Sequence, residues 1–180
     1  MSQTFTYIVD LFDELAKLTA HESEKNLYYQ YGHPQEIIES IQEMSKSRKI
    51  EGRRFPLLAL FQDFDETKGE RADVQSSVSL HIVIATSTGP QLKAKQRYEK
   101  TFRPVLYPIY EALIKMIQSC GYFINVQELV PHTKTDRLYW GKNGLYKLEN
   151  NVFNDFIDAI EITNLRLQTK QNICINTNSN

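Results

Sequence analysis

Hydrophobic positions near the start of the chain recur with the period of a helix. Phe5, Ile8, Phe12 and Leu15 fall on one helical face, with polar residues between them. This spacing is typical of an amphipathic helix, because a turn of about 3.6 residues brings such positions onto one side. We predict a helix over residues 3–19.

An aromatic segment and a second amphipathic segment follow. Residues 27–31 are rich in tyrosine and are closed by Gly32, which predicts a short strand before a break. Pro34 stands where a helix can begin, and the helix should fade in the polar segment 45–49. The apolar stripe of this helix consists of Ile37, Ile38, Ile41 and Met44.

Two further segments predict a pair of strands. Residues 55–61 are almost continuously apolar, as in a strand covered on both faces, and Pro56 should lie at its start. Residues 78–85 alternate between two faces. We expect these strands to pair in antiparallel fashion, and we expect the polar segment 63–77 between them to form a hairpin loop or exposed arm.

The second half of the chain begins with a long helical pattern. Apolar residues recur at helical spacing from Tyr98 to Ile117, and Pro104 and Pro108 should kink or restart this helix. Gly121 is its predicted end. Residues 122–126 then favour a strand.

A loop and a closing strand complete the pattern. Residues 131–151 mix charges with glycines and predict an irregular loop, with room for one short hairpin. The last strand spans residues 160–167. Its apolar phase shifts by one residue at Thr163–Asn164, which predicts a β-bulge or a bend.

Composition and length favour one domain. The chain has 180 residues, 41% of them hydrophobic and 24% charged, as in an ordinary globular protein. The predicted fold is α+β: a small, mainly antiparallel sheet packed by helices, with an extended hairpin arm. We place the domain at 1–168 and a polar, flexible tail at 169–180, where little can be buried.

Charge and targeting signals narrow the possible partners. The formal net charge is -1, without the positive excess that drives non-specific binding to phosphates. The first residues have neither the basic start of a signal peptide nor an uninterrupted apolar span, so no membrane is expected. The two cysteines, Cys120 and Cys174, form no recognisable framework and suit a reducing compartment.

The sequence offers little for catalysis, metals or cofactors. No histidine has metal-ligand spacing, and neither standard glycine-rich phosphate loop is present. His81 favours a packed strand residue, and His132 with Asp136 lacks a nucleophile. Asp63 and Asp65 lack the rest of an EF-hand loop. We therefore predict no enzyme, no catalytic residue, no metal and no cofactor; a site scattered around His132 and Asp136 is the enzyme hypothesis that remains.

A basic segment gives the main alternative. Residues 93–103 carry five basic side chains with two aromatic ones between them, as a phosphate-binding face would. A solvated helix face with its aromatic residues turned inward would have the same pattern of residues, and we favour that interpretation. A DNA-binding accessory protein that uses residues 93–103 is the alternative function.

Protein–protein contact is the favoured activity. The polar segment 63–77 should be accessible, and Tyr139–Trp140 in a charged loop is equally consistent with an interface anchor and with a core role. The candidate interface residues are Asp63, Asp65, Lys68, Glu70, Arg71, Tyr139, Trp140 and Lys142.

Three stretches resemble a family of small proteins encoded in phages and prophages of Bacteroides-like bacteria, which are neck and tail-terminator (tail-completion) components. The first is FPLLALFQDF at 55–64. The second is VSLHIVIAT followed by RYEKTFRPVLYPIYEALI, within 78–114. The third is HTKTDRLYWG with NDFIDAIEITNLRL, within 132–167. These are patterned hydrophobic segments in the family's order, without a catalytic signature.

The resemblance implies a structural virion protein. It would form a homo-oligomeric ring, expected to be a hexamer, between the head–tail connector and the tail tube. Its partners would be further copies of itself, the tube protein, the connector and other neck proteins, and the DNA that passes through the lumen. It would be assembled in the cytoplasm of the host bacterium and act in the virion.

Overall fold

The structure is a computed structural model in which helices flank a seven-stranded sheet. It describes residues 6–46 (for 41–46 the backbone alone), 55–89, 91–124, 126, 128–138, 140 and 157–171. The strands are β1 (Tyr28–Gly32), β2 (Leu57–Phe61), β3 (Glu66–Lys68), β4 (Val74–Ser87), β5 (Phe123–Ile124), β6 (Thr133–Arg137) and β7 (Ile157–Lys170). The helices are α1 (Ile8–Ser23), α2 (Pro34–Lys46), α3 (Ala94–Arg97), the π-helical segment η2 (Tyr98–Leu106) and α4 (Tyr107–Ser119).

The sheet is mixed but mainly antiparallel. Its order is β1-β2-β4-β7-β5, with β3 paired to β4 and β6 paired to β7. Only the pairing of β1 with β2 is parallel among the described strands. The two central strands, β4 and β7, have 14 residues each and span about 45 Å at the usual rise per residue. This confirms the predicted α+β fold and the pairing of β2 with β4.

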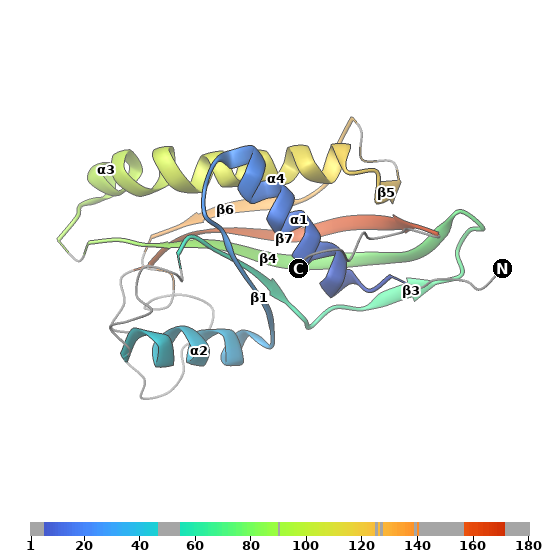
Figure 1. Ribbon diagram of the computed structural model, residues 1–180, viewed down its shortest axis with the longest axis horizontal. Coiled ribbons are helices and arrows are strands. Elements are labelled where there is room, and N and C mark those ends of the chain that lie inside the picture. Colours follow the sequence, from blue (N-terminus) through green and yellow to red (C-terminus); the bar gives the residue numbers. More distant parts are fainter. Residues whose placement is uncertain are drawn as a thin grey trace.

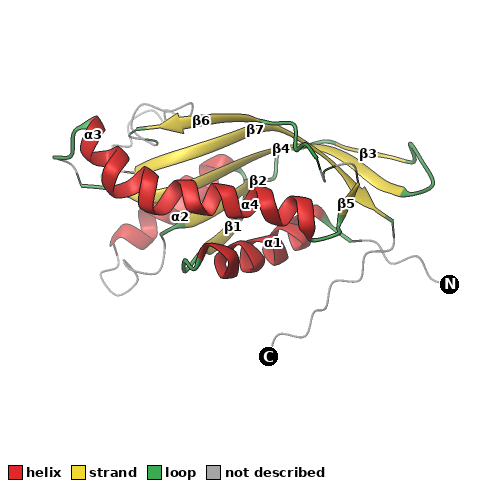
Figure 2. Ribbon diagram, turned by 90° about the horizontal axis from the view of Figure 1, so that it is seen from above, coloured by secondary structure: helices red, strands yellow, loops and turns green. Residues whose placement is uncertain are grey.

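The helices cover the sheet unequally. Figure 1 shows α1 and the long helix formed by α3, η2 and α4 on one side of the sheet, and α2 on the other side. Figure 2, from above, shows α1 and α4 next to each other over the strands. The hairpin of β3 and β4 extends to the end of the molecule opposite α3 (Figure 1). It is the extended arm that the sequence predicts.

The main core lies between the sheet and the helices α1 and α4. Alternate residues of β4 and β7 point into it, because successive strand side chains face opposite ways. The buried residues at its centre include Leu11, Phe12, Leu15, Leu80, Ile82, Ile84, Ile109, Leu113, Ile160, Ile162 and Leu165. This is the burial that the helical and strand periodicities predict.

A smaller core lies under α2 on the opposite face. Ile37 and Ile38 of α2 pack with Leu57, Ala59 and Phe61 of β2. All five residues of β2 are therefore buried, as expected of a strand covered on both faces. Pro56 directly precedes this strand, where its missing N–H costs no ladder hydrogen bond.

The prolines change the long helix without ending it. Pro104 lies inside η2 and Pro108 lies in the first turn of α4. A proline has no N–H and its ring collides with the preceding turn, and π-helical winding is a known way to relieve such a conflict within a helix. The helix continues to Ser119, and Gly121 follows it with a φ of 77°.

The predicted bulge is present in β7. Leu80 pairs with Leu165 and Ile82 pairs with Ile162, so two residues of β7 lie opposite His81 alone. One of the two, Asn164, has a φ of 54° in the left-handed region, which asparagine tolerates better than most residues. The change of phase read in the sequence is therefore this bulge.

Two boundaries differ from the prediction at the chain ends. The first helix begins at Ile8, after Tyr7 in extended conformation, and ends at Ser23; residues 3–5 lie outside the described part. The last strand begins at Ile157 and continues to Lys170, past the predicted domain end at 168. Thr169 is buried, and its Oγ1 accepts a hydrogen bond from the Ser76 N–H at 3.1 Å. Residues 172–180 of the predicted tail lie outside the described part.

A strand also forms where an irregular loop was predicted. Residues 133–137 form β6, an edge strand on β7, while residues 141–156 of the predicted loop are not described. All five residues of β6 are polar, so the hydrophobic alternation that signals a strand is missing. No helix in the described part of the chain is long and apolar enough to cross a membrane.

The bulge gives a first prediction. Replacing Asn164 with valine should destabilise the protein by about 1–2 kcal/mol, because a β-branched residue is strained at a φ of 54°. Asn164→Gly is the matched control: it removes the same side chain but accepts this backbone, so it should be more stable than the valine variant. Urea unfolding measures both. Equal stability of the two variants would contradict the assigned geometry.

Candidate interaction surface

The hairpin brings five of the eight predicted interface residues together. Asp63, Asp65, Lys68, Glu70 and Arg71 are all exposed and lie on or beside β3 and the turn into β4. The turn includes Gly69, whose φ of 79° favours glycine. The hairpin is thus a continuous charged surface at one end of the molecule.

Local pairs order this surface. The Arg71 guanidinium donates two hydrogen bonds to the Asp73 carboxylate, at 3.0 and 2.8 Å. Lys68 Nζ lies 3.5 Å from Glu66 Oε2, and the Ser77 hydroxyl donates a hydrogen bond to the Glu70 carboxylate. Exposed pairs of this kind contribute little to stability, and they leave the charged groups accessible to a partner.

A groove opens beside the middle of β4, where the chain passes from β2 to β3. It has a volume of about 460 Å³ and lies between the start of α1, the end of β1 and the segment that leads into β3. Tyr7 is 65% exposed and Tyr31 is 52% exposed on its walls. Phe64, Asp10 and Glu66 also line it. Exposed tyrosines beside carboxylates are a surface that a partner could cover.

Sequence reasoning missed the role of Tyr7 in this groove for an identifiable reason. The predicted helix over 3–19 placed Tyr7 inside a helix, whereas it precedes Ile8 in extended conformation. Phe64 and Glu66 fell within or beside the predicted arm, but nothing in the sequence brought them near Tyr7. The tyrosines of residues 27–31 were the available signal, but they served only to predict a strand.

Trp140 lies in the core and not on a surface. It is 3% exposed, packs in the smaller core with Ile157 and Ala159, and donates a hydrogen bond from Nε1 to Glu161 Oε1 at 2.9 Å. The other Glu161 oxygen accepts from Arg137 Nε at 2.8 Å. These contacts correct its assignment as an interface anchor in the isolated chain. Tyr139 and Lys142, the remaining candidates, lie outside the described residues.

One of the five basic residues in segment 93–103, Arg97, is buried in an ion pair. The side chains of Arg97 and Asp158 are completely buried, with Nη1 and Oδ1 2.7 Å apart. Arg97 also donates to the carbonyl oxygens of Leu92 and Gly89, and Thr101 donates to Asp158 at 2.9 Å. Arg97 is therefore a structural residue that fixes the start of the helix to β7.

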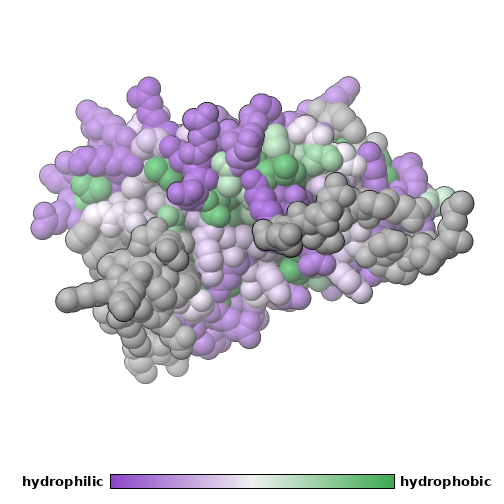
Figure 3. All heavy atoms as spheres, viewed as in Figure 1, coloured by the Kyte–Doolittle hydropathy of each residue, from purple (hydrophilic) through white to green (hydrophobic). Residues whose placement is uncertain are grey.

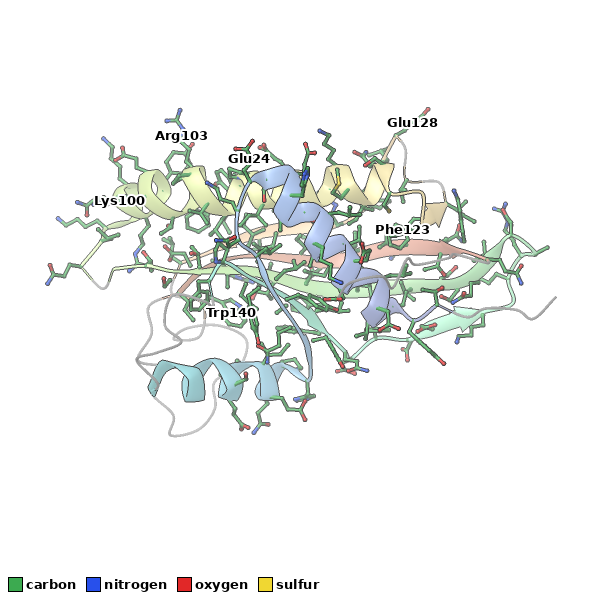
Figure 4. The ribbon with its side chains drawn as sticks, viewed as in Figure 1. Glu24, Lys100, Arg103, Phe123, Glu128 and Trp140 are labelled. Atoms are coloured by element: carbon green, nitrogen blue, oxygen red, sulfur yellow. The ribbon has the colours of Figure 1, made fainter. Side chains whose placement is uncertain are left out.

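The other basic residues of this segment are exposed. Lys93, Lys95, Lys100 and Arg103 lie on the surface, with Glu99 as the one acidic residue among them. Figure 4 shows Lys100 and Arg103 pointing away from the helix at the α3 end of the molecule. Figure 3 shows hydrophilic side chains gathered over this end. This surface and the hairpin lie at opposite ends of the long axis.

The histidines take part in packing and hydrogen bonding. Burial lowers the pKa of His81, whose ring meets the edge of Phe61 at a centroid distance of 4.5 Å. His132 and Asp136 each bond a tyrosine of α4: His132 Nε2 lies 2.8 Å from the Tyr110 hydroxyl, and the Tyr107 hydroxyl donates to Asp136 at 2.7 Å. Together they dock β6 against α4.

The tyrosine hydroxyls of this cluster stay protonated. Desolvation and the bond to Asp136 raise the pKa of Tyr107 to about 12, and desolvation raises the pKa of Tyr110. Burial also raises the pKa of the Cys120 thiol, which makes it a poor nucleophile. Among the described residues, no group of three or more His, Cys, Asp or Glu side chains could hold a metal ion.

The chain was compared with protein-family models and with curated proteins. No protein-family model matches the chain, and no curated protein matches it either.

The buried ion pair gives a second prediction. Arg97→Met should destabilise the protein by about 3–5 kcal/mol, because it removes the buried guanidinium that pairs with the Asp158 carboxylate. Lys100→Met is the matched control: it makes the same change three residues away at an exposed site and should cost no more than about 0.5 kcal/mol. Urea unfolding of both variants is the measurement. Similar losses in the two would mean that Arg97 is not the structural residue of this segment.

Proposed function

We propose that this chain is a structural virion protein of a phage neck or tail: a tail terminator that forms a homo-oligomeric ring between the head–tail connector and the tail tube. The observation that carries the proposal is the hairpin of β3 and β4. It extends beyond the helices at one end of the molecule, and together with the segment before β3 it carries six exposed charged residues (Figure 1). The sequence resemblance to tail terminators is the second support.

The hairpin is built as a rigid arm. Its longer strand, β4, is the same strand whose residues Leu80, Ile82 and Ile84 are buried in the main core. The arm is therefore a continuation of the central sheet. Its position relative to the domain is fixed, so ordering it costs little when a neighbouring subunit binds. A rigid arm that reaches a neighbour is suited to a closed ring of identical, head-to-tail contacts.

The sheet face beside the arm is polar, which also suits it to reversible contacts with a partner. α2 covers only part of this face, and towards the hairpin Ser79 and Arg166 are exposed opposite each other in neighbouring strands. Ser77 and Gln168 form the next pair, joined by a 3.2 Å hydrogen bond. A polar surface of this kind fits transient docking to tube and connector proteins better than a permanent apolar interface.

The proposal predicts assembly in solution. Light scattering on a sizing column should give a native mass close to six times the 21.0 kDa chain mass, either for the protein alone or after the tail tube protein of the same phage is added. The native mass should be measured at low and at high salt concentration, because charged contacts weaken as the salt concentration rises.

Two results would contradict the proposal. One is a strict monomer at all concentrations that also ignores tube protein. The other is a monomer that retards DNA at low salt with a steep salt dependence, which would favour the DNA-binding alternative through Lys93, Lys95, Lys100 and Arg103.

A further inference from the structure

We infer that the contact between neighbouring copies joins the acidic aromatic groove of one copy to the exposed basic surface of the next. This inference rests on the proposed ring. The groove is the one formed by Tyr7, Asp10, Tyr31, Phe64 and Glu66. The basic surface consists of Lys93, Lys95, Lys100 and Arg103, together with Tyr98.

Opposite charges are collected on two separate parts of the molecule. Residues 63–73, at the groove and hairpin, contain five acidic and two basic side chains, and Asp10 adds another carboxylate. In the other part, residues 93–103 present four exposed basic side chains and one glutamate, since Arg97 is buried. A net charge of -1 for the whole chain therefore conceals two patches of opposite sign. Complementary patches of this kind select both the partner and its orientation.

The two patches also carry exposed aromatic residues. Tyr98 is 48% exposed on the basic surface, and its ring meets the edge of Tyr107 at a centroid distance of 6.1 Å. Tyr7 and Tyr31 are more exposed still, on the walls of the groove. Aromatic residues framed by charges are typical of interface centres, and guanidinium and ammonium groups bind favourably over tyrosine rings.

A second copy is the partner that fits these features best. The two patches differ from each other, so a self-contact between them is heterologous and has a direction. The groove lies beside the middle of β4 and the basic surface lies at the α3 end, so each copy can bind one neighbour through each patch (Figures 1 and 4). Head-to-tail contacts with a constant rotation close into a ring, which is the assembly that a terminator needs.

Charge reversal tests the contact directly. The first variant reverses the basic surface with Lys100→Glu and Arg103→Glu. The second reverses the groove with Asp10→Lys and Glu66→Lys, the two carboxylates that line it. Each variant alone should raise the protein concentration at the assembly midpoint at least about tenfold at low salt, because like charges then face each other. Mass photometry over a concentration series measures the midpoint.

Restoration separates a lost contact from a damaged fold. An equal mixture of the two variants should assemble like the unaltered protein, and so should one chain with all four substitutions, because opposite charges again meet at every contact. The matched control is Glu24→Lys with Glu128→Lys, two exposed acidic residues away from both patches, and it should assemble normally.

The outcomes distinguish the inference from the function on which it rests. If the unaltered protein assembles and both reversed variants assemble equally well, the groove contact is wrong while the ring stands. If each reversed variant fails and neither the mixture nor the fourfold variant recovers, the pairing of these two patches is also overturned. If the unaltered protein never assembles, with or without tube protein, the proposed function fails as well.

Discussion

The antiparallel pairing of β4 with β7 is the interaction on which the rest of the structure depends. The two 14-residue strands pair from Val74 to Ser87, and their alternating side chains supply the centre of the main core on one face and part of the smaller core on the other. The bulge at Asn164 changes the phase of β7 partway along, so apolar residues on both sides of it reach the main core. Beyond the helices, β4 continues as the arm. The same ladder thus holds the domain together and projects its most accessible surface.

The distribution of charge follows from this architecture. The Arg97–Asp158 pair anchors the start of the long helix to the start of β7, and the neighbouring basic residues stay in solvent. The hairpin collects carboxylates at the other end of the same strands. Because the strands are long, the patches are far apart and cannot neutralise each other within one chain. Both patches are therefore accessible to a partner, as the proposed ring requires.

The sequence predicted the elements with clear periodicity and missed those without it. β2, α2, the β2–β4 pairing, the arm and the bulge were all legible, because burial imposes their patterns on single segments. β6 was missed because an all-polar edge strand carries no such pattern. For Trp140 the sequence left an interface role and a core role open, because its partner Glu161 is 21 residues away in the sequence. The groove could not be predicted at all. It depends on Tyr7, Tyr31 and Phe64 meeting across three elements, and no local rule reports such a meeting.

Electron microscopy of the purified protein, negatively stained at concentrations where it associates, tests most directly whether this chain builds a closed ring. Head-to-tail contacts with a fixed rotation predict rings of one size, with a constant number of subunits and a central opening. The tail tube protein should then attach to one side of the ring. Single particles of monomer size at every concentration, with and without tube protein, would contradict the ring, and open filaments of variable length would contradict its closure.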